Sequence, residues 1–202
     1  MKTGARSTAF LGDLGAFLAG ALLPPAFAPF HLFPLAVISP AILFRLWTGV
    51  SARRAFGRGW LYGLGLFGVG VSWVQVSIHQ FGLPVLAFSV SATVLFVAIL
   101  ALYPAGAGYS ANRFFPGDER LCYLLALPSL WTAIEWLRGW FLTGFPWLNL
   151  GYSQTDSPLG GLAPVLGVYG VSLAAAWSAG VLAYVSARRQ RLRMLEIGRA
   201  HV

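Results

Sequence analysis

Charged residues are scarce in this chain. Asp, Glu, Lys and Arg make up 10% of its 202 residues, against about 25% in a soluble domain. Hydrophobic residues make up 57% of the chain, and the mean hydropathy is +0.71. This composition excludes an ordinary soluble domain and predicts an integral membrane protein.

Lysine and cysteine are nearly absent as well. Lys2 is the only lysine and Cys122 the only cysteine, so the sequence holds no internal disulfide and no metal-ligand spacing. Cys122 lies in the apolar run LCYLLAL, where we expect a small buried hydrophobe. The sequence also lacks GxSxG, P-loop, HExxH and CxxC motifs. We therefore predict no catalytic residue, no metal site and no cofactor in this chain.

Apolar runs are what the chain has in abundance. A helix needs about 20 residues to cross the hydrocarbon, and six runs approach that length: 8–24, 32–48, 59–78, 84–107, 121–140 and 161–186. We therefore expect an all-α fold, a polytopic transmembrane bundle of about six helices.

The first apolar run has a second interpretation. Lys2 and Arg6 precede it, and Ala26-Phe27-Ala28 resembles a signal-peptide cleavage site. Pro29 would directly follow that site and disfavour cleavage. A retained span is the favoured interpretation, with a cleaved signal peptide as the alternative.

Basic residues are distributed unevenly among the connections between these runs. They gather before the first run and after the second, fourth and sixth, whereas 25–31, 79–83 and 141–160 contain no Lys or Arg. Cytoplasmic loops are enriched in these residues. We therefore expect both termini on the cytoplasmic side and 141–160 on the outside. This pattern also accounts for the net charge of +8 without a nucleic-acid partner.

Glycines recur within the run GWLYGLGLFGVGVSW. Small residues let transmembrane helices approach closely, so we expect these glycines to pack within the bundle. They are Gly59, Gly63, Gly65, Gly68 and Gly70. The chain shows no internal repeat, which disfavours a transporter with two related halves.

The stretch EWLRGWFLTGFPWLNLGYSQ, residues 135–154, places charge among aromatic side chains. On a helix over 121–140, Glu135 and Arg138 share one face with Trp131. One explanation is structural: the two charges neutralise each other and the tryptophans anchor the interface. The other explanation is a site that faces lipid, and the residues alone leave both open.

The following segment, 141–160, is broken by glycine and proline but keeps large apolar side chains. Such a segment cannot face the hydrocarbon, so we expect an irregular interfacial loop that could hold acyl chains. His31 and His79 have no partner at a recognisable spacing, and we expect interfacial polar residues there. The candidate substrate-binding residues are Glu135, Trp136, Arg138, Trp140, Phe145, Trp147 and Tyr152.

Three blocks make the sequence recognisable. GALLPPAFAPFHLFPLA at 20–36, GVGVSWVQVSIHQFG at 68–82 and the long block at 135–172 closely resemble the apolipoprotein N-acyltransferase family. The resemblance extends from about residue 10 to 190. It implies a multi-pass enzyme of the bacterial inner membrane that transfers an acyl chain from a membrane phospholipid to the N-terminal diacylglyceryl-cysteine of an apolipoprotein.

The resemblance also implies a Glu-Lys-Cys triad in a periplasmic nitrilase-like domain. Neither Lys2 nor Cys122 can be carried over to that triad, and such a domain would follow residue 190. We therefore expect residues 1–190 to be the transmembrane domain of such an enzyme, inactive by itself. The last residues, EIGRAHV at 196–202, can be encoded by the start of a common sequencing adapter, which predicts a non-native tail.

Within this family, Arg138 could meet a lipid phosphate while Glu135 fixes its orientation, and the aromatic candidates could line the acyl path. A non-enzymatic lipid-binding or scaffold module is the main alternative. A small transporter is disfavoured, because few ionisable groups, chiefly Asp13, lie within the apolar runs.

Overall fold

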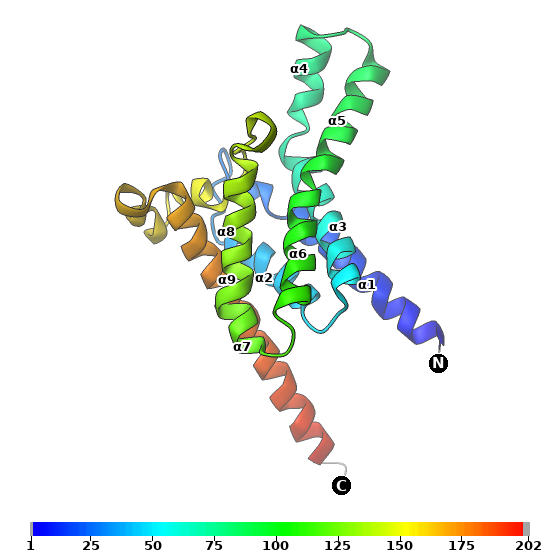
Figure 1. Cartoon of the computed structure of the whole chain (residues 1–202), viewed down its shortest axis with the longest axis vertical. Coiled ribbons are helices and arrows are strands. Elements are labelled where there is room, and N and C mark those ends of the chain that lie inside the picture. Colours follow the sequence, from blue (N-terminus) through cyan, green and yellow to red (C-terminus); the bar gives the residue numbers. More distant parts are fainter. Residues whose placement is uncertain (1, 200–202) are drawn as a thin grey trace.

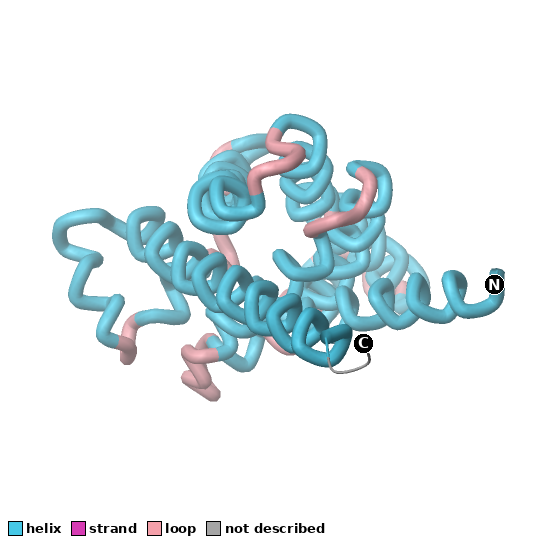
Figure 2. The backbone as a smooth tube through the Cα atoms, turned by 90° about the horizontal axis from the view of Figure 1, so that it is seen from below, coloured by secondary structure: helices cyan, strands magenta, loops and turns pink. Residues whose placement is uncertain are grey.

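The computed structural model of the chain describes residues 2–199, which form helices joined by loops and contain no strand (Figure 2). The all-α prediction is therefore confirmed. Of the predicted non-native tail, residues 200–202 lie outside the described residues, and the origin of that tail stays a prediction.

The helices are longest at the start and end of the chain and shortest in the middle. The α-helices are α1 (Lys2–Ala21), α2 (Leu35–Trp47), α3 (Ala52–Gly70), α4 (Trp73–Phe81), α5 (Leu86–Leu100), α6 (Leu102–Phe114), α7 (Glu119–Leu121), α8 (Leu127–Arg138) and α9 (Ala163–Arg199). A π-helix, η2 (Cys122–Ala126), joins α7 to α8, and the 3-10 helices are η1 (Pro24–Ala26), η3 (Phe141–Thr143), η4 (Leu150–Gln154) and η5 (Pro158–Leu162).

Apolar helices of spanning length are fewer than the predicted six. Within residues 2–199, three helical stretches are long and apolar enough to cross a membrane: Ala9–Ala26, Leu86–Phe114 and Pro158–Arg193. A fourth is reached if α3 and α4, which meet at a bend of 57°, count as one span. The count of about six is therefore not confirmed. One predicted run, 32–48, forms only the 13-residue helix α2, which is too short to cross alone.

Local sequence explains where several helices begin and end. The Ser51 hydroxyl accepts a hydrogen bond from the Arg54 backbone N–H and caps α3. The Asp118 carboxylate accepts from the backbone N–H groups of Arg120 and Leu121 and caps α7. Both are favoured N-cap residues, because a short side-chain oxygen satisfies N–H groups that have no partner within the helix.

Helices distant in sequence lie side by side in the bundle. Helix α3 packs against both α1 and α6, and α9 packs against α2 and α8. In Figure 1, α4 and the start of α5 project at one end, and the segment between α8 and α9 loops out to the side.

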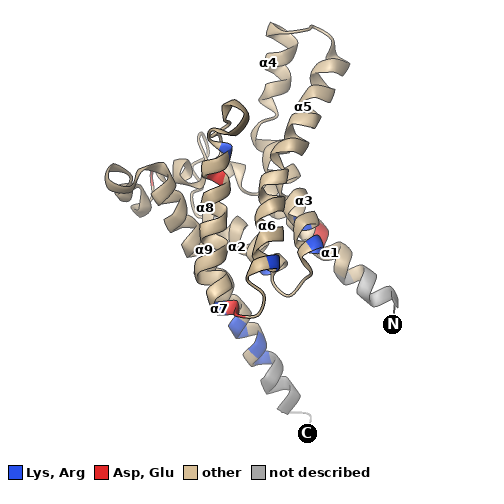
Figure 3. Ribbon diagram, viewed as in Figure 1, with Lys and Arg blue, Asp and Glu red and all other residues tan. Residues whose placement is uncertain are grey.

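Arginines on several helices gather near the end opposite α4 (Figure 3). They lie near the end of α2, at the start of α3, near the end of α6, on α7 and on the last part of α9, whereas Arg138 is the last residue of α8. We call this the arginine-rich end. The asymmetry agrees with the loop pattern of the sequence, and its assignment to the cytoplasmic side stays a prediction.

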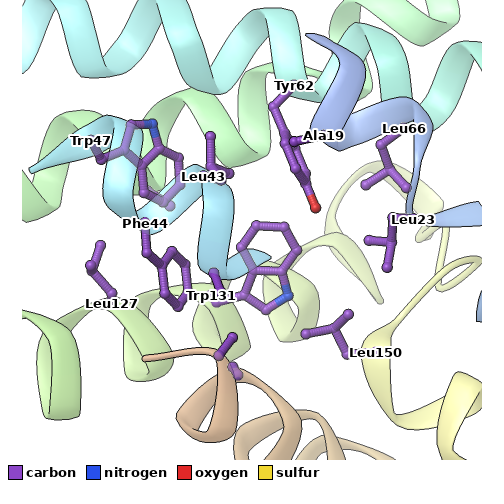
Figure 4. Packing of buried hydrophobic residues seen from close by; sticks show 14 of the residues in the cluster. Ala19, Leu23, Leu43, Phe44, Trp47, Tyr62, Leu66, Leu127, Trp131 and Leu150 are labelled. Carbon is purple, nitrogen blue, oxygen red and sulfur yellow. The ribbon is translucent and has the colours of Figure 1, made fainter. Parts of the chain in front are cut away.

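The core lies where α1, α2, α3 and α8 meet. Trp131 packs edge-on against Tyr62, with ring centroids 5.8 Å apart, and against Phe44 at 6.2 Å (Figure 4). The Ser39 hydroxyl donates to the Ala19 carbonyl at 2.7 Å, and its oxygen lies 2.7 Å from the Tyr62 hydroxyl. These buried contacts fix α8, and therefore its charged end, relative to the other helices.

Glycines set the distance between α3 and its neighbours. A Cβ added at Gly63 would lie 2.5 Å from the Ala101 Cα, and one at Gly65 would collide with the Phe17 carbonyl of α1. The close packing predicted for these two positions is confirmed. Gly68 faces open space instead, so no neighbouring atom requires a glycine at this position.

Candidate functional site

The residues that link α8 to α9 form an irregular segment, residues 141–160, which we call the aromatic loop. It contains the short 3-10 helices η3 and η4 and the start of η5. Leu142, Thr143, Gly144 and Leu148 have positive φ angles of 49°, 76°, 81° and 63°. Non-glycine residues seldom adopt this conformation without support from their surroundings.

Arg138 supplies much of that support. Arg138 is the last residue of α8, and it is 4% exposed. Its Nη1 donates to the Phe145 carbonyl at 2.6 Å and to the Trp147 carbonyl, and its Nη2 donates to Asn149 Oδ1 at 2.6 Å. Backbone carbonyls without a regular partner are thereby satisfied by a buried guanidinium.

Glu135, which lies one turn before Arg138 on α8, also supports the loop. Glu135 is 2% exposed. Its Oε1 accepts from the Leu150 backbone N–H and from Trp131 Nε1, both at 2.9 Å. The backbone N–H of Gly151, the residue after Leu150, donates to the Ser172 hydroxyl of α9 at 2.8 Å. The carboxylate therefore connects α8, the core and the aromatic loop.

Mutual neutralisation of Glu135 and Arg138, one of the two explanations left open by the sequence, does not take the form of a direct salt bridge. Both side chains point to one face of α8, but no salt bridge joins them among the described residues. Each binds loop backbone instead, because a chain turning through irregular angles presents N–H and C=O groups that have no helical partner. Arg138 is also buried by these contacts, which differs from the expectation that it meets a lipid phosphate.

The aromatic side chains of the loop take the opposite arrangement, with their rings at the surface. Trp147 and Tyr152 are 51% and 50% exposed. The Trp147 ring lies 5.1 Å from Phe145 and 6.1 Å from Trp73 of α4. Phe145 also packs edge-on against Phe96 of α5 at 5.0 Å.

Trp147 and Tyr152 form one side of a surface groove of about 560 Å³, which we call the aromatic groove. Its other side comes from the segment after α1 and from the junction of α3 and α4. The lining residues are Phe27, Ala28, Gly70, Trp73, Pro146, Trp147, Leu148 and Tyr152.

Trp136 and Trp140 do not join this groove. Their ring centroids lie 5.3 Å apart and both side chains are about half exposed, at 53% and 52%. The seven candidates thus fall into three groups: the buried pair Glu135 and Arg138, the groove-side aromatics, and this separate exposed pair.

His31, His79 and Cys122 have different surroundings in the structure. His31 Nδ1 lies 2.6 Å from the Asp156 carboxylate, so the loop after α1 meets the aromatic loop. His79 Nδ1 is buried without a partner in the described part of the chain. Cys122 is partly buried in the helix before α8, in agreement with a packing role.

Sequence reasoning missed several residues that build this region. Asn149 is fully buried and binds Arg138, and a signal existed, since it is a lone amide within the apolar run WLNLG. Trp73 and Ser172 carried no such signal, because their contacts depend on how α4 and α9 pack against the loop.

Comparison with known proteins finds relatives over most of the chain. Residues 19–181 match the family model described as the apolipoprotein N-acyltransferase N-terminal domain. An apolipoprotein N-acyltransferase of Coxiella burnetii is 51% identical over 168 residues, which cover 83% of this chain and 35% of the relative. Those of Vibrio cholerae and Methylococcus capsulatus are 48% and 47% identical, covering 89% and 87% of this chain and 35% of each relative.

Apolar helices and an irregular loop bound by buried charges define a polytopic α-helical membrane protein. The match over most of its length is more specific: the chain belongs to the apolipoprotein N-acyltransferase family. It spans about a third of the length of these relatives, as the 35% coverage shows.

Proposed function

We propose that residues 1–190 are the transmembrane domain of an apolipoprotein N-acyltransferase of the bacterial inner membrane, with the N-terminus in the cytoplasm. The complete enzyme would move an acyl chain from a membrane phospholipid to the N-terminal diacylglyceryl-cysteine of an apolipoprotein. This chain alone would be inactive, because the family's Glu-Lys-Cys triad has no counterpart among its residues. The observation that carries the proposal is the match of residues 19–181 to the family's N-terminal domain.

Within this function, we assign the aromatic groove to the acyl chain. Phe27, Trp73, Trp147 and Tyr152 offer an apolar surface that is open at the side of the bundle. An extended hydrocarbon is held by such contacts in proportion to the apolar area removed from lipid or water. Phe145 supports the Trp147 ring by stacking on it, with 21° between the ring planes.

Glu135 and Arg138 receive a positioning role in this proposal. Their hydrogen bonds hold backbone carbonyl and N–H groups within residues 145–150. This stretch includes Pro146 and Trp147, which line the groove. They would act on the substrate only through the loop. Trp136 and Trp140, exposed at the end of α8, would contact lipid at the membrane interface, where tryptophan is enriched.

The first experiment addresses the groove in the chain itself. The purified chain is reconstituted in vesicles containing a phospholipid with a photoreactive diazirine on its acyl chain, and cross-linked peptides are mapped by mass spectrometry. We expect cross-links on peptides that contain Trp147 and Tyr152. Gly70→Val should reduce them, since a new side chain there points at Leu148 and into the groove.

Gly68→Val is the matched control. It adds the same side chain two residues earlier on α3, where nothing lies within 4 Å. Equal cross-linking in both variants and in the parent would show that the acyl chain does not bind in the groove.

The second experiment addresses the activity. The uninterrupted source locus is recovered with long reads, and its product is assayed for acyl transfer from phospholipid to a diacylglyceryl-cysteine peptide. Transfer that is lost when a downstream cysteine is replaced supports the proposal. A genuine stop near residue 195 and no transfer would contradict it and favour a lipid-binding or scaffold role.

A further inference from the structure

The arginine-rich end contains a second hollow, which shares no lining residue with the aromatic groove. It has a volume of about 440 Å³ and lies between α7 and the last part of α9. Its lining consists of Glu119, Arg120, Tyr184, Arg188 and Arg191. Three guanidinium groups against one carboxylate give this hollow a formal excess of positive charge.

Among the side chains that the structure describes, one of the three arginines is neutralised by a neighbour. Arg191 forms a salt bridge with Glu119. The side chains of Arg120 and Arg188 have no hydrogen bond or salt bridge to any side chain that the structure describes, and both are exposed. Two donors of an anion site are therefore available.

Contacts behind the hollow hold its walls in place. Arg45 of α2 donates through Nη1 to the Tyr123 hydroxyl at 3.0 Å and through Nη2 to Gln190 Oε1 at 2.9 Å. The Tyr123 ring lies 6.2 Å from the ring of Tyr184, a lining residue. The end of α9 is thus connected to α2 and to the π-helix that follows α7.

Exposed aliphatic side chains lie near the lining arginines in the sequence, on the same stretches of helix. Leu121 and Leu125 follow Arg120 in the chain, and Leu182 and Val185 precede Arg188 by one or two turns; all four are exposed. A charged hollow followed within one or two turns by exposed aliphatic side chains matches a molecule with an anionic head and hydrocarbon tails. A soluble anion would gain nothing from the aliphatic surface.

We propose that this hollow binds the headgroup of an anionic phospholipid, with the phosphate between Arg120 and Arg188 and the acyl chains along Leu121, Leu125 and Val185. The site is separate from the aromatic groove and does not depend on the proposed acyl transfer. Glu119 retains Arg191 and leaves Arg120 and Arg188 for the phosphate.

The test is lipid binding measured by native mass spectrometry. The chain is purified and delipidated in a neutral detergent, then titrated with phosphatidylglycerol and, separately, with phosphatidylcholine. We expect preferential retention of phosphatidylglycerol. Arg120→Gln and Arg188→Gln should each weaken that retention about fivefold, the effect of one basic group near an anionic lipid.

Arg53→Gln is the matched control, because Arg53 is an exposed arginine at the same end of the bundle and does not line the hollow. It removes the same charge and should leave the lipid preference unchanged. Circular dichroism of each variant establishes that the helices are retained. If one of the two hollow variants does not fold, the other decides the outcome.

Three results would overturn the proposal. Equal retention of the two lipids by the parent chain would remove the headgroup preference. An equal loss in Arg53→Gln would assign the effect to overall charge. Displacement of phosphatidylglycerol by an equal concentration of inorganic phosphate would assign the hollow to a soluble anion.

Discussion

Two clusters of buried or half-buried charge occur in this bundle, and they differ in what the charges bind. Asp13 of α1 forms direct salt bridges with Arg54 Nη2 at 3.0 Å and Arg58 Nε at 3.2 Å, both from α3, and Arg58 also donates to the Leu46 carbonyl near the end of α2 at 2.6 Å. Glu135 and Arg138 of α8 form no such bridge and instead bind the backbone of the aromatic loop.

The difference follows from the kind of structure that each cluster meets. Helices α1 and α3 satisfy their own backbone groups, so their side chains are available to each other. The aromatic loop has no such ladder, and its carbonyls and N–H groups need partners wherever water is excluded. A charged pair in an apolar chain can therefore serve to fix an irregular backbone as well as to join two helices.

The largest effect is expected from Arg138→Ala. The change leaves the part-buried carbonyls of Phe145 and Trp147 and the buried Asn149 Oδ1 without their donor, and it removes a charge from beside Glu135. We expect a loss of about 3–5 kcal/mol in the free energy of unfolding. Thermal unfolding in detergent measures it, and a melting temperature within error of the parent would show that the loop does not depend on this arginine.

Glu135→Ala should rank next. It removes the acceptor of the Leu150 N–H and of Trp131 Nε1, two buried donors, at a cost of about 2–3 kcal/mol. Glu135→Gln keeps an oxygen for both donors and should recover most of this loss. Denaturation of both variants under the same conditions checks the order, and equal losses would mean that the negative charge matters more than the hydrogen bonds.

Asp13→Asn should have a smaller effect. The side chains of Asp13 and Arg54 are 35% and 40% exposed, so solvent screens their attraction, and Arg58, at 11% exposure, keeps its hydrogen bond to the Leu46 carbonyl. We expect about 1 kcal/mol, because partly exposed ion pairs contribute little. A loss as large as that of Arg138→Ala would erase the distinction between the two clusters.

The smallest effect on stability is expected from Trp136→Ala. This ring is about half exposed and supports no loop backbone. Its removal should change the free energy of unfolding by less than about 0.5 kcal/mol, as at other surface positions. Chemical denaturation is the measurement, and a loss above 2 kcal/mol would show that the Trp136–Trp140 pair is part of the core.

The sequence allowed the class of fold to be predicted but not the way its helices divide. Apolar runs revealed an all-α membrane bundle, and the glycine spacing on α3 revealed close packing at Gly63 and Gly65. Hydropathy could not show that 32–48 yields a short helix, or that 59–78 bends after Gly70, because both depend on where the chain turns against its neighbours.

The candidate site was predicted in the same partial way. Charge within an apolar run identified Glu135 and Arg138, and helical spacing placed them with Trp131 on one face. Their partners could not be predicted. Hydrogen bonds to backbone groups depend on the path of the loop, and every residue type offers the same backbone groups. Asn149 is the exception, since an amide in an apolar run needs a partner.

The central claim, that Arg138 serves to hold the aromatic loop, is tested most directly by hydrogen exchange of the loop amides. The parent chain, Arg138→Ala and Asp13→Asn are compared by mass spectrometry on peptides covering residues 145–152. The account predicts faster exchange of these peptides in Arg138→Ala and parental rates in Asp13→Asn. Parental rates in Arg138→Ala, or equal acceleration in both variants, would contradict it.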